Sequence, residues 1–191
     1  MSRAIFYVTQ LTAYFTVGLI IRIIIRPKVK RLFQKINKPL IIASNHQHFL
    51  DPFFVMASLS FKDFLKCLPI RFITANKYMK FPLLPLLLTF GCYKANKEEN
   101  YSCTDESIKF IKNGFTVFIF PEGGIVKEKL NNPKIGVGVI AIKSTAKVLP
   151  VNVSLNNLVL KITFGSFLLS KSVEDPKAFA NKVLKVIYEY E

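Results

Sequence analysis

Both histidines of the chain lie in one short stretch, residues 44–52, which reads Ser-Asn-His-Gln-His-Phe-Leu-Asp-Pro. A neutral imidazole accepts a proton near pH 7, and a nearby carboxylate fixes its tautomer and stabilises the cation that forms. His46 and Asp51 are five positions apart, which puts them on poorly matched faces of a straight helix, so the pair needs a turn between them. This arrangement supplies a base and the residue that orients it, without a nucleophilic side chain.

A third candidate lies farther along the chain. Only 12 residues are acidic, and two of them, Asp51 and Glu122, follow strands that we expect to be buried. A buried carboxylate must be paired or hydrogen-bonded, so its position needs a reason. Glu122 lies in the turn Pro-Glu-Gly-Gly, where glycines let backbone N–H groups approach an anion or a polar ligand.

These residues need a strand, a loop and a helix to position them. Residues 39–44 predict a short buried strand, and Asp51-Pro52 predicts a helix start, because Asp is a good N-cap and Pro suits the first helical position. The β-branched and aromatic residues 115–120 predict a second strand that runs into the Glu122 turn. Open α/β sheets usually place their chemistry on such loops.

The rest of the chain alternates strands and helices. Further strands are expected at residues 70–75, 90–94, 148–153 and 158–164. Helices are expected at residues 53–60, at 105–113 with Thr104 as N-cap and Gly114 as the stop, at 135–146, and from Asp175-Pro176 onward with Phe179, Val183, Val186, Ile187 and Tyr190 on the apolar side. Gly136 and Gly138 indicate close packing against a neighbour. The order predicts an α/β fold, a mostly parallel layered sheet flanked by helices.

The N-terminal segment combines apolar and basic character. Residues 4–21 carry no charge, and about 18 apolar residues is the lower limit for spanning a bilayer. Seven basic residues follow without an acid between them: Arg22, Arg26, Lys28, Lys30, Arg31, Lys35 and Lys38. This cluster indicates a cytoplasmic side and binding to anionic headgroups. The segment either spans the membrane, lies on it, or is a buried core helix with a solvated basic face.

Composition supports a membrane rather than a nucleic-acid partner. The chain of 191 residues is 51% hydrophobic with a net charge of +15 and a mean hydropathy of +0.32. Such a balance indicates a polyanionic partner, and the densest basic cluster directly follows the apolar segment, which favours an anionic membrane surface. Residues 77–88 are apolar and interrupted by prolines. They either lie against the membrane or line an acyl tunnel, or they are a core segment broken by the prolines.

The three cysteines are widely spaced, which indicates reduced, buried thiols.

Several of these stretches together resemble the glycerolipid acyltransferases, most closely the bacterial 1-acylglycerol-3-phosphate acyltransferases. Residues 45–51 resemble the family's NHxSxxD motif, and residues 120–123 its FPEG motif. Residues 91–97 resemble the GxxFxxR block, with Lys97 where Arg is usual. Residues 134–136 fit Lys-x-Gly, and residues 148–151 resemble the fourth block. The resemblance covers residues 39–153 in the right order.

The resemblance implies a membrane-associated O-acyltransferase of phospholipid biosynthesis on the cytoplasmic face of a bacterial inner membrane. His46 would be the general base and Asp51 would hold its ring. The acceptor, a lysophospholipid such as lysophosphatidic acid, would attack the thioester of acyl-CoA or acyl-carrier protein directly, with no metal, cofactor or nucleic acid. The acceptor site would contain Asn45, Lys97, Glu122, Gly123, Gly124 and Lys127. Residues 1–35 would form the membrane-associating segment and residues 36–191 the acyltransferase domain.

The chain also departs from the family pattern. Where the family has Thr-Arg-Ser after FPEG, this chain has Gly-Ile-Val, and an aliphatic side chain does not replace the phosphate-binding Arg. Either Lys127 substitutes as a point charge, or the acceptor is a different lyso-phospholipid or an aminolipid. His48, which stands where Ser is usual, is an alternative base, and the motif favours His46.

Two rival functions remain. A metal-dependent hydrolase would use His46, His48, Asp51 and Glu122, but the chain has no further His to complete an imidazole-rich site. A non-enzymatic basic protein that coats membranes or nucleic acid would explain the charge but not His46, Asp51 or the Glu122 turn.

Overall fold

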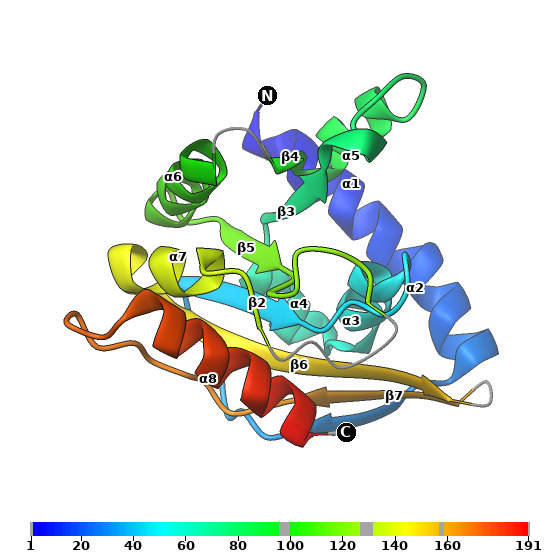
Figure 1. Cartoon of the computed structure of the whole chain (residues 1–191). Helices are drawn as coiled ribbons and strands as arrows, with labels where there is room; N and C mark the ends of the chain where they lie inside the picture. The colour runs from blue at the N-terminus through cyan, green and yellow to red at the C-terminus, as the bar shows by residue number, and fades with distance from the viewer. Residues whose placement is uncertain (1, 96–99, 127–131, 157–158, 191) are drawn as a thin grey trace.

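A seven-stranded sheet with helices on both faces forms the core of the molecule (Figure 1). The computed structural model describes residues 2–95, 100–126, 132–156 and 159–190, and of residues 100–102 only the backbone. The strand order is β1-β7-β6-β2-β5-β3-β4. The strands are β1 (Lys28–Arg31), β2 (Leu40–Ser44), β3 (Ile70–Ala75), β4 (Cys92–Ala95), β5 (Thr116–Ile119), β6 (Lys147–Asn156) and β7 (Val159–Phe164).

Helices precede β1, connect several of the strands and follow β7 along the chain. They are α1 (Arg3–Phe15), α2 (Val17–Ile20), the π-helix η1 (Ile21–Ile25), α3 (Asp51–Ser58), α4 (Phe61–Cys67), the 3-10 helix η2 (Asn76–Tyr78), α5 (Leu84–Phe90), α6 (Asn100–Lys112), α7 (Gly136–Ser144) and α8 (Pro176–Glu189). Neighbouring strands run parallel except β6 and β7, which form an antiparallel hairpin. The predicted α/β fold with a mostly parallel sheet is confirmed.

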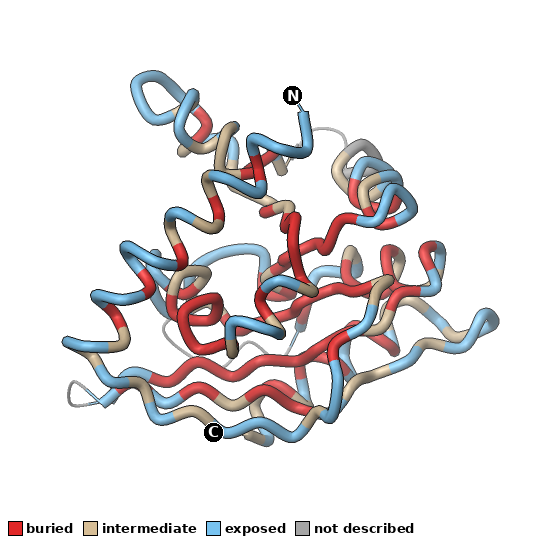
Figure 2. Tube along the Cα trace, turned by 180° about the vertical axis from the view of Figure 1, so that it is seen from behind, coloured by how far each residue is buried: buried red, intermediate tan, exposed pale blue. Residues whose placement is uncertain are grey.

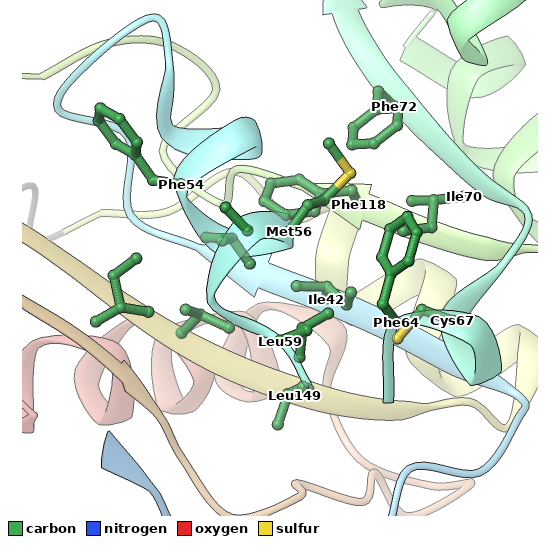
Figure 3. Close-up of a cluster of buried hydrophobic side chains, with 14 of the residues drawn as sticks. Ile42, Phe54, Met56, Leu59, Phe64, Cys67, Ile70, Phe72, Phe118 and Leu149 are labelled. Atoms are coloured by element: carbon green, nitrogen blue, oxygen red, sulfur yellow. The ribbon is translucent and has the colours of Figure 1, made fainter. Parts of the chain in front are cut away.

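The central strand β2 shows why the sheet needs helices on both faces. All five of its residues are buried. Because side chains alternate along a strand, Leu40 and Ile42 enter one hydrophobic cluster, whereas Ile41 and Ala43 enter another. The first cluster, shown in Figure 3, packs β2 against α3 and α4. The second packs it against α6, α7 and α8.

Gly138 marks the tightest contact between two of these helices. A Cβ built on Gly138 would lie 1.9 Å from the carbonyl oxygen of Pro176, at the start of α8. Only glycine therefore allows α7 and α8 to approach so closely, which confirms the expected close packing at this position. Gly136 has no such neighbour within 4 Å.

Three local features differ from the prediction or were not predicted. The basic stretch Lys28–Arg31 forms an edge strand, paired in parallel with β7, and its binding to headgroups stays a prediction. The helix α4 was missed, although Ser60 caps it by accepting the backbone N–H of Asp63. The helix α6 begins at Asn100, so Thr104 lies inside it. The division of the chain between residues 35 and 36 stays a prediction.

The N-terminal helical run lies along the domain, and polar groups hold one of its faces there. Gln10 is fully buried, and its amide accepts the N–H of Ile70 and donates to the carbonyl oxygens of Ile70 and Phe90. The Tyr14 hydroxyl donates to the carbonyl oxygen of Leu59 farther along. The Gln10 and Tyr14 side chains thus bond backbone groups of the domain that would otherwise bond water, and these specific contacts hold the helix on the domain.

The opposite face of the same run is apolar and exposed (Figure 2). Residues Arg3–Ile25 form a helical run of 23 residues, within which an 18-residue stretch has a mean hydropathy of 1.7, so the run is long and apolar enough to cross a membrane by length and composition. Val8, Leu19 and Ile24 are 64%, 50% and 74% exposed. The chain thus carries an N-terminal apolar helix that could associate with a membrane.

Candidate active site

Two loops meet at one edge of the sheet and form the candidate site. The loop that holds His46 follows β2, and the turn that holds Glu122 follows β5. Because β2 and β5 are parallel neighbours, with Ile42 beside Phe118, both loops leave the sheet at the same edge (Figure 1). This is the edge at which open α/β sheets bind ligands.

The His46 ring is paired with the Asp51 carboxylate. Nδ1 lies 3.0 Å from Oδ2 of Asp51, which is 1% exposed. The same oxygen accepts the backbone N–H groups of Gln47 and His48, each at 2.8 Å. A carboxylate at Nδ1 favours the tautomer with its proton on that nitrogen. The lone pair is then on Nε2, which no described residue bonds, so Nε2 can accept a proton from a substrate.

The position of Asp51 corrects a prediction from the sequence. The helix α3 includes Asp51 as its first residue, and Leu50 occupies the N-cap position. The carboxylate therefore does not cap the helix but turns back to the loop that precedes it. Oδ1 is buried without a hydrogen-bond partner among the described residues. The local Asp-Pro signal located the helix start correctly but not the use of the side chain.

Phe120 fixes the plane of the imidazole. The two rings stack with centroids 3.7 Å apart and an angle of 11° between their planes. The His46 side chain is only 15% exposed. Since one ring face is covered and Nδ1 is held, the ring has little freedom to turn, and Nε2 keeps one direction.

Glu122 holds the backbone of the same histidine. Its Oε2 accepts the N–H of His46 at 2.7 Å, and its Oε1 accepts the hydroxyl of Tyr188 in the last turn of α8. The N–H of Val126 in turn donates to the carbonyl oxygen of His46 at 2.9 Å. Burial raises the pKa of Glu122, and the hydrogen bonds from Tyr188 and His46 act in the opposite direction. The two loops are therefore joined at His46.

The glycines of the second loop form an open surface beside a cation. Gly123 has φ +76°, and a Cβ there would lie 2.9 Å from Cγ of Lys134. A Cβ at Gly124 would meet no atom within 4 Å, so space remains above this residue. The N–H of Lys134 donates to the carbonyl oxygen of Pro121 at 2.8 Å, which ties the lysine to this loop.

The other expected site residues differ in where they lie. Asn45 is fully buried, and its amide bonds both the N–H and the carbonyl oxygen of Val153 in β6, each at 2.7 Å. It thus ties the loop to the sheet, and its contact with substrate stays a prediction. Lys97 and Lys127 lie outside the described residues.

His48 differs from His46 in its surroundings. Its side chain is exposed, and its Nδ1 accepts the N–H of Leu50 at 3.3 Å. Only its backbone N–H reaches Asp51, so the ring that pairs with this carboxylate is that of His46. Over the described part of the chain, no group of three or more His, Cys, Asp or Glu is arranged to hold a metal ion.

Sequence reasoning missed three contributors to the site. Tyr188 reaches Glu122 across 66 positions, and no local pattern links them. Phe120 was assigned no role beyond its place in the motif, although its ring stacks on His46. Lys134 was likewise noted only as the start of Lys-x-Gly. Its position just before the helix that follows the glycine turn is the signal that could have identified it as a site residue.

The comparison with known proteins agrees with this geometry. The sequence model of the acyltransferase family matches residues 22–154. The chain therefore belongs to the acyltransferase family and is an acyl-transferring enzyme. Among solved structures, it is similar to the 1-acyl-sn-glycerophosphate (LPA) acyltransferase PlsC of Thermotoga maritima, with a TM-score of 0.67 and 18% identity over 95% of this chain and 79% of that chain. No curated protein matches it.

Proposed function

We propose that the protein moves a fatty acyl group from acyl-CoA or acyl-carrier protein to the hydroxyl of a lysophospholipid such as lysophosphatidic acid. One observation carries this proposal: His46 is held by Asp51 at Nδ1 and leaves Nε2 open at the ligand-binding edge of the sheet. The similar Thermotoga protein is named for a 1-acyl-sn-glycerophosphate acceptor, which supports the same acceptor class here.

The reaction follows from the two ring nitrogens. Nε2 of His46 takes the proton of the acceptor hydroxyl while its oxygen attacks the thioester carbonyl carbon. The new C–O bond forms, the C–S bond breaks, and the imidazolium returns its proton to the departing thiolate. Asp51 stabilises the cation between these steps. A positioned base contributes a factor on the order of 10²–10⁴, and holding both substrates together contributes further.

The turn after Glu122 favours a second class of acceptor. Ile125 stands where the family carries a phosphate-binding Arg, and its side chain is 45% exposed. An aliphatic side chain gives a phosphate no donor. A lyso-phospholipid with a larger headgroup, or an aminolipid, needs that Arg less. Lys134, whose side chain lies beside Gly123, is a described cation near this turn.

The N-terminal run supports a location on the membrane surface. Its docked face keeps contacts with the domain from Gln10 to Arg22, which donates to the carbonyl oxygen of Ala57. A helix that crossed a bilayer would have to give up contacts along this length. We infer that the run lies in the interface with Val8, Leu19 and Ile24 toward the lipid, on the cytoplasmic side expected from the basic residues.

The helix α5 extends this apolar surface. None of its residues is fully buried, although Leu84, Leu87 and Phe90 pack against the core. Leu86, on the helix, and Phe81, just before it, are 66% and 86% exposed. It lies beside α1, to which the Thr9 hydroxyl joins it by donating to the carbonyl oxygen of Thr89 (Figure 1). Exposed apolar residues gathered in this way are typical of interaction surfaces.

A direct assay tests the proposal. The purified full chain is given acyl-CoA or acyl-carrier protein together with lysophosphatidic acid, other lyso-phospholipids or an aminolipid, and acylated product is measured. Thiol release that depends on one of these acceptors is expected. Absence of transfer from either donor to every acceptor would contradict the proposal.

A further inference from the structure

An open depression of about 360 Å³ lies at the opposite end of α3 from the candidate active site. Arg22, Arg26, Arg31 and Ser58 are among the residues that line it. Ser58 is the last residue of α3, whereas Asp51 is the first. At a rise of 1.5 Å per residue, the helix separates the two by about 10 Å. The depression is therefore a second site and not part of the acyl-transfer site.

The three arginines bring positive charge without a counter-charge. Among the described residues, none of them forms an ion pair with a carboxylate. Their hydrogen bonds go to backbone carbonyl oxygens: Arg22 donates to Ala57 and Tyr14, Arg26 to Ile23, and Arg31 to Ser58. Each guanidinium has five N–H donors, so most donors remain available for an anion.

Capping of the α3 C-terminus explains only part of this cluster. Arg22 and Arg31 bond the carbonyl oxygens of Ala57 and Ser58 at that end, where cations are favourable. Arg26 bonds none of them, because its Nε donates to Ile23. Capping therefore accounts for the positions of Arg22 and Arg31 but not for that of Arg26.

The neighbouring side chains indicate the kind of anion. Ile23 and Ile24 stand between Arg22 and Arg26 in η1 and are 58% and 74% exposed. Guanidinium groups match a phosphate with paired donors, and the isoleucines suit hydrocarbon. We propose that this depression binds the phosphate of an anionic membrane phospholipid whose acyl chains pass along the isoleucines. The proposal rests on the interfacial location proposed above.

Vesicle binding by the full chain tests the site. Binding is measured to phosphatidylcholine vesicles and to the same vesicles with phosphatidylglycerol. Since a charge near the surface contributes roughly 1 kcal/mol, R26Q/R31Q is expected to bind the anionic vesicles about 30-fold more weakly and the neutral vesicles as wild type. The matched variant K143Q/K182Q removes two exposed lysines from α7 and α8, and it is expected to bind as wild type. Equal losses in both variants would overturn the site.

A second pair of measurements separates a built site from general charge attraction. R26K/R31K keeps the charge but loses the planar donors, and a several-fold loss on anionic vesicles is expected. Unchanged binding by this variant would overturn the phosphate site. Arg26→Gln, which removes no contact with α3, repeats the test should the double variant fold poorly.

Two further measurements identify the source of the phosphate and separate this site from the acyl-transfer site. Inorganic phosphate alone is added to the protein; stabilisation by phosphate without a preference for anionic vesicles would overturn the lipid assignment. Acyl transfer in detergent micelles is measured in parallel and is expected to be unchanged in R26Q/R31Q. If R26Q/R31Q loses its preference for anionic vesicles but keeps acyl transfer, the result concerns this site alone. If the wild-type protein shows no acyl transfer, the result concerns the proposed function. Wild-type protein that binds no vesicles would overturn both the location and the site.

Discussion

The Glu122 carboxylate accepts the backbone N–H of His46 at 2.7 Å and so joins two loops that are 76 positions apart. The same carboxylate accepts the Tyr188 hydroxyl from α8. The histidine is therefore held at its backbone by Glu122, at Nδ1 by Asp51 and on one ring face by Phe120. Such support from several elements is what a positioned base requires.

Tyr188→Phe tests whether the C-terminal helix supports the base. The variant keeps the ring but loses the hydrogen bond to Glu122. Because Tyr188 contacts Glu122, we expect kcat to fall about tenfold, the equivalent of 1.4 kcal/mol, while KM for the thioester stays unchanged. Steady-state kinetics of the purified protein measure both. Tyr190→Phe is the matched control, since that ring lies against Gly165, and a similar loss of kcat there would argue against a specific role for Tyr188.

Glu122→Gln tests the buried carboxylate through pH. Burial raises the pKa of Glu122 above its ordinary value of 4.5, so the folded protein keeps this proton to a higher pH than the unfolded chain does. The free energy of unfolding contributed by this group is therefore greatest at low pH and falls as pH rises through that window. We therefore expect the free energy of unfolding of wild type to fall relative to that of Glu122→Gln as pH rises from about 4.5 to neutrality. Denaturation at several pH values measures it, and a constant difference would contradict the assignment.

Asp51→Asn tests the orientation of the imidazole. The amide keeps the shape and one oxygen for the N–H groups of Gln47 and His48, but it removes the charge that steadies the protonated ring. We expect kcat to fall by a factor on the order of 10²–10⁴ with the fold intact by circular dichroism. Asp63→Asn alters a carboxylate that accepts the Ser60 hydroxyl outside the site and should leave kcat unchanged. Activity of Asp51→Asn within tenfold of wild type would count against the pair.

The two faces of the N-terminal run should respond to different variants. Replacing exposed Val8, Leu19 and Ile24 by Ser should weaken vesicle binding by at least about tenfold, while the free energy of unfolding changes by no more than about 0.5 kcal/mol per substitution because these side chains lie at the surface. Gln10→Leu should do the reverse: it leaves the Ile70 backbone groups unpaired and should cost about 2–4 kcal/mol of stability. Co-sedimentation and denaturation measure the two effects. Undiminished vesicle binding by the triple Ser variant would refute the interfacial location.

Local patterns predicted the elements around the base well. Residues 40–43 are apolar on both faces and, with Ser44, form the buried central strand. Asp175 caps α8 by accepting the N–H of Ala178, as the Asp-Pro signal indicates. Both features depend only on neighbours in sequence, which is why they could be predicted.

Features that depend on distant residues could not be predicted in this way. The strand β1 is charged and mostly exposed, so it lacks the apolar alternation of a strand and owes its form to pairing with β7. The Asn45 amide meets Val153 across 108 positions, and Tyr188 meets Glu122 across 66. Tertiary contacts decided these roles, and a single sequence carries no record of them.

The central claim is that Nε2 of His46 takes the proton of the acceptor hydroxyl. The most direct measurement compares the single-turnover rate of acyl transfer to the preferred lysophospholipid in wild type, His46→Ala and His48→Ala, with vesicle binding measured on the same samples. We expect His46→Ala to lose transfer by a factor on the order of 10²–10⁴ while it still binds vesicles, and His48→Ala to stay close to wild type. Substantial transfer by His46→Ala, or a comparable loss in His48→Ala, would contradict the account.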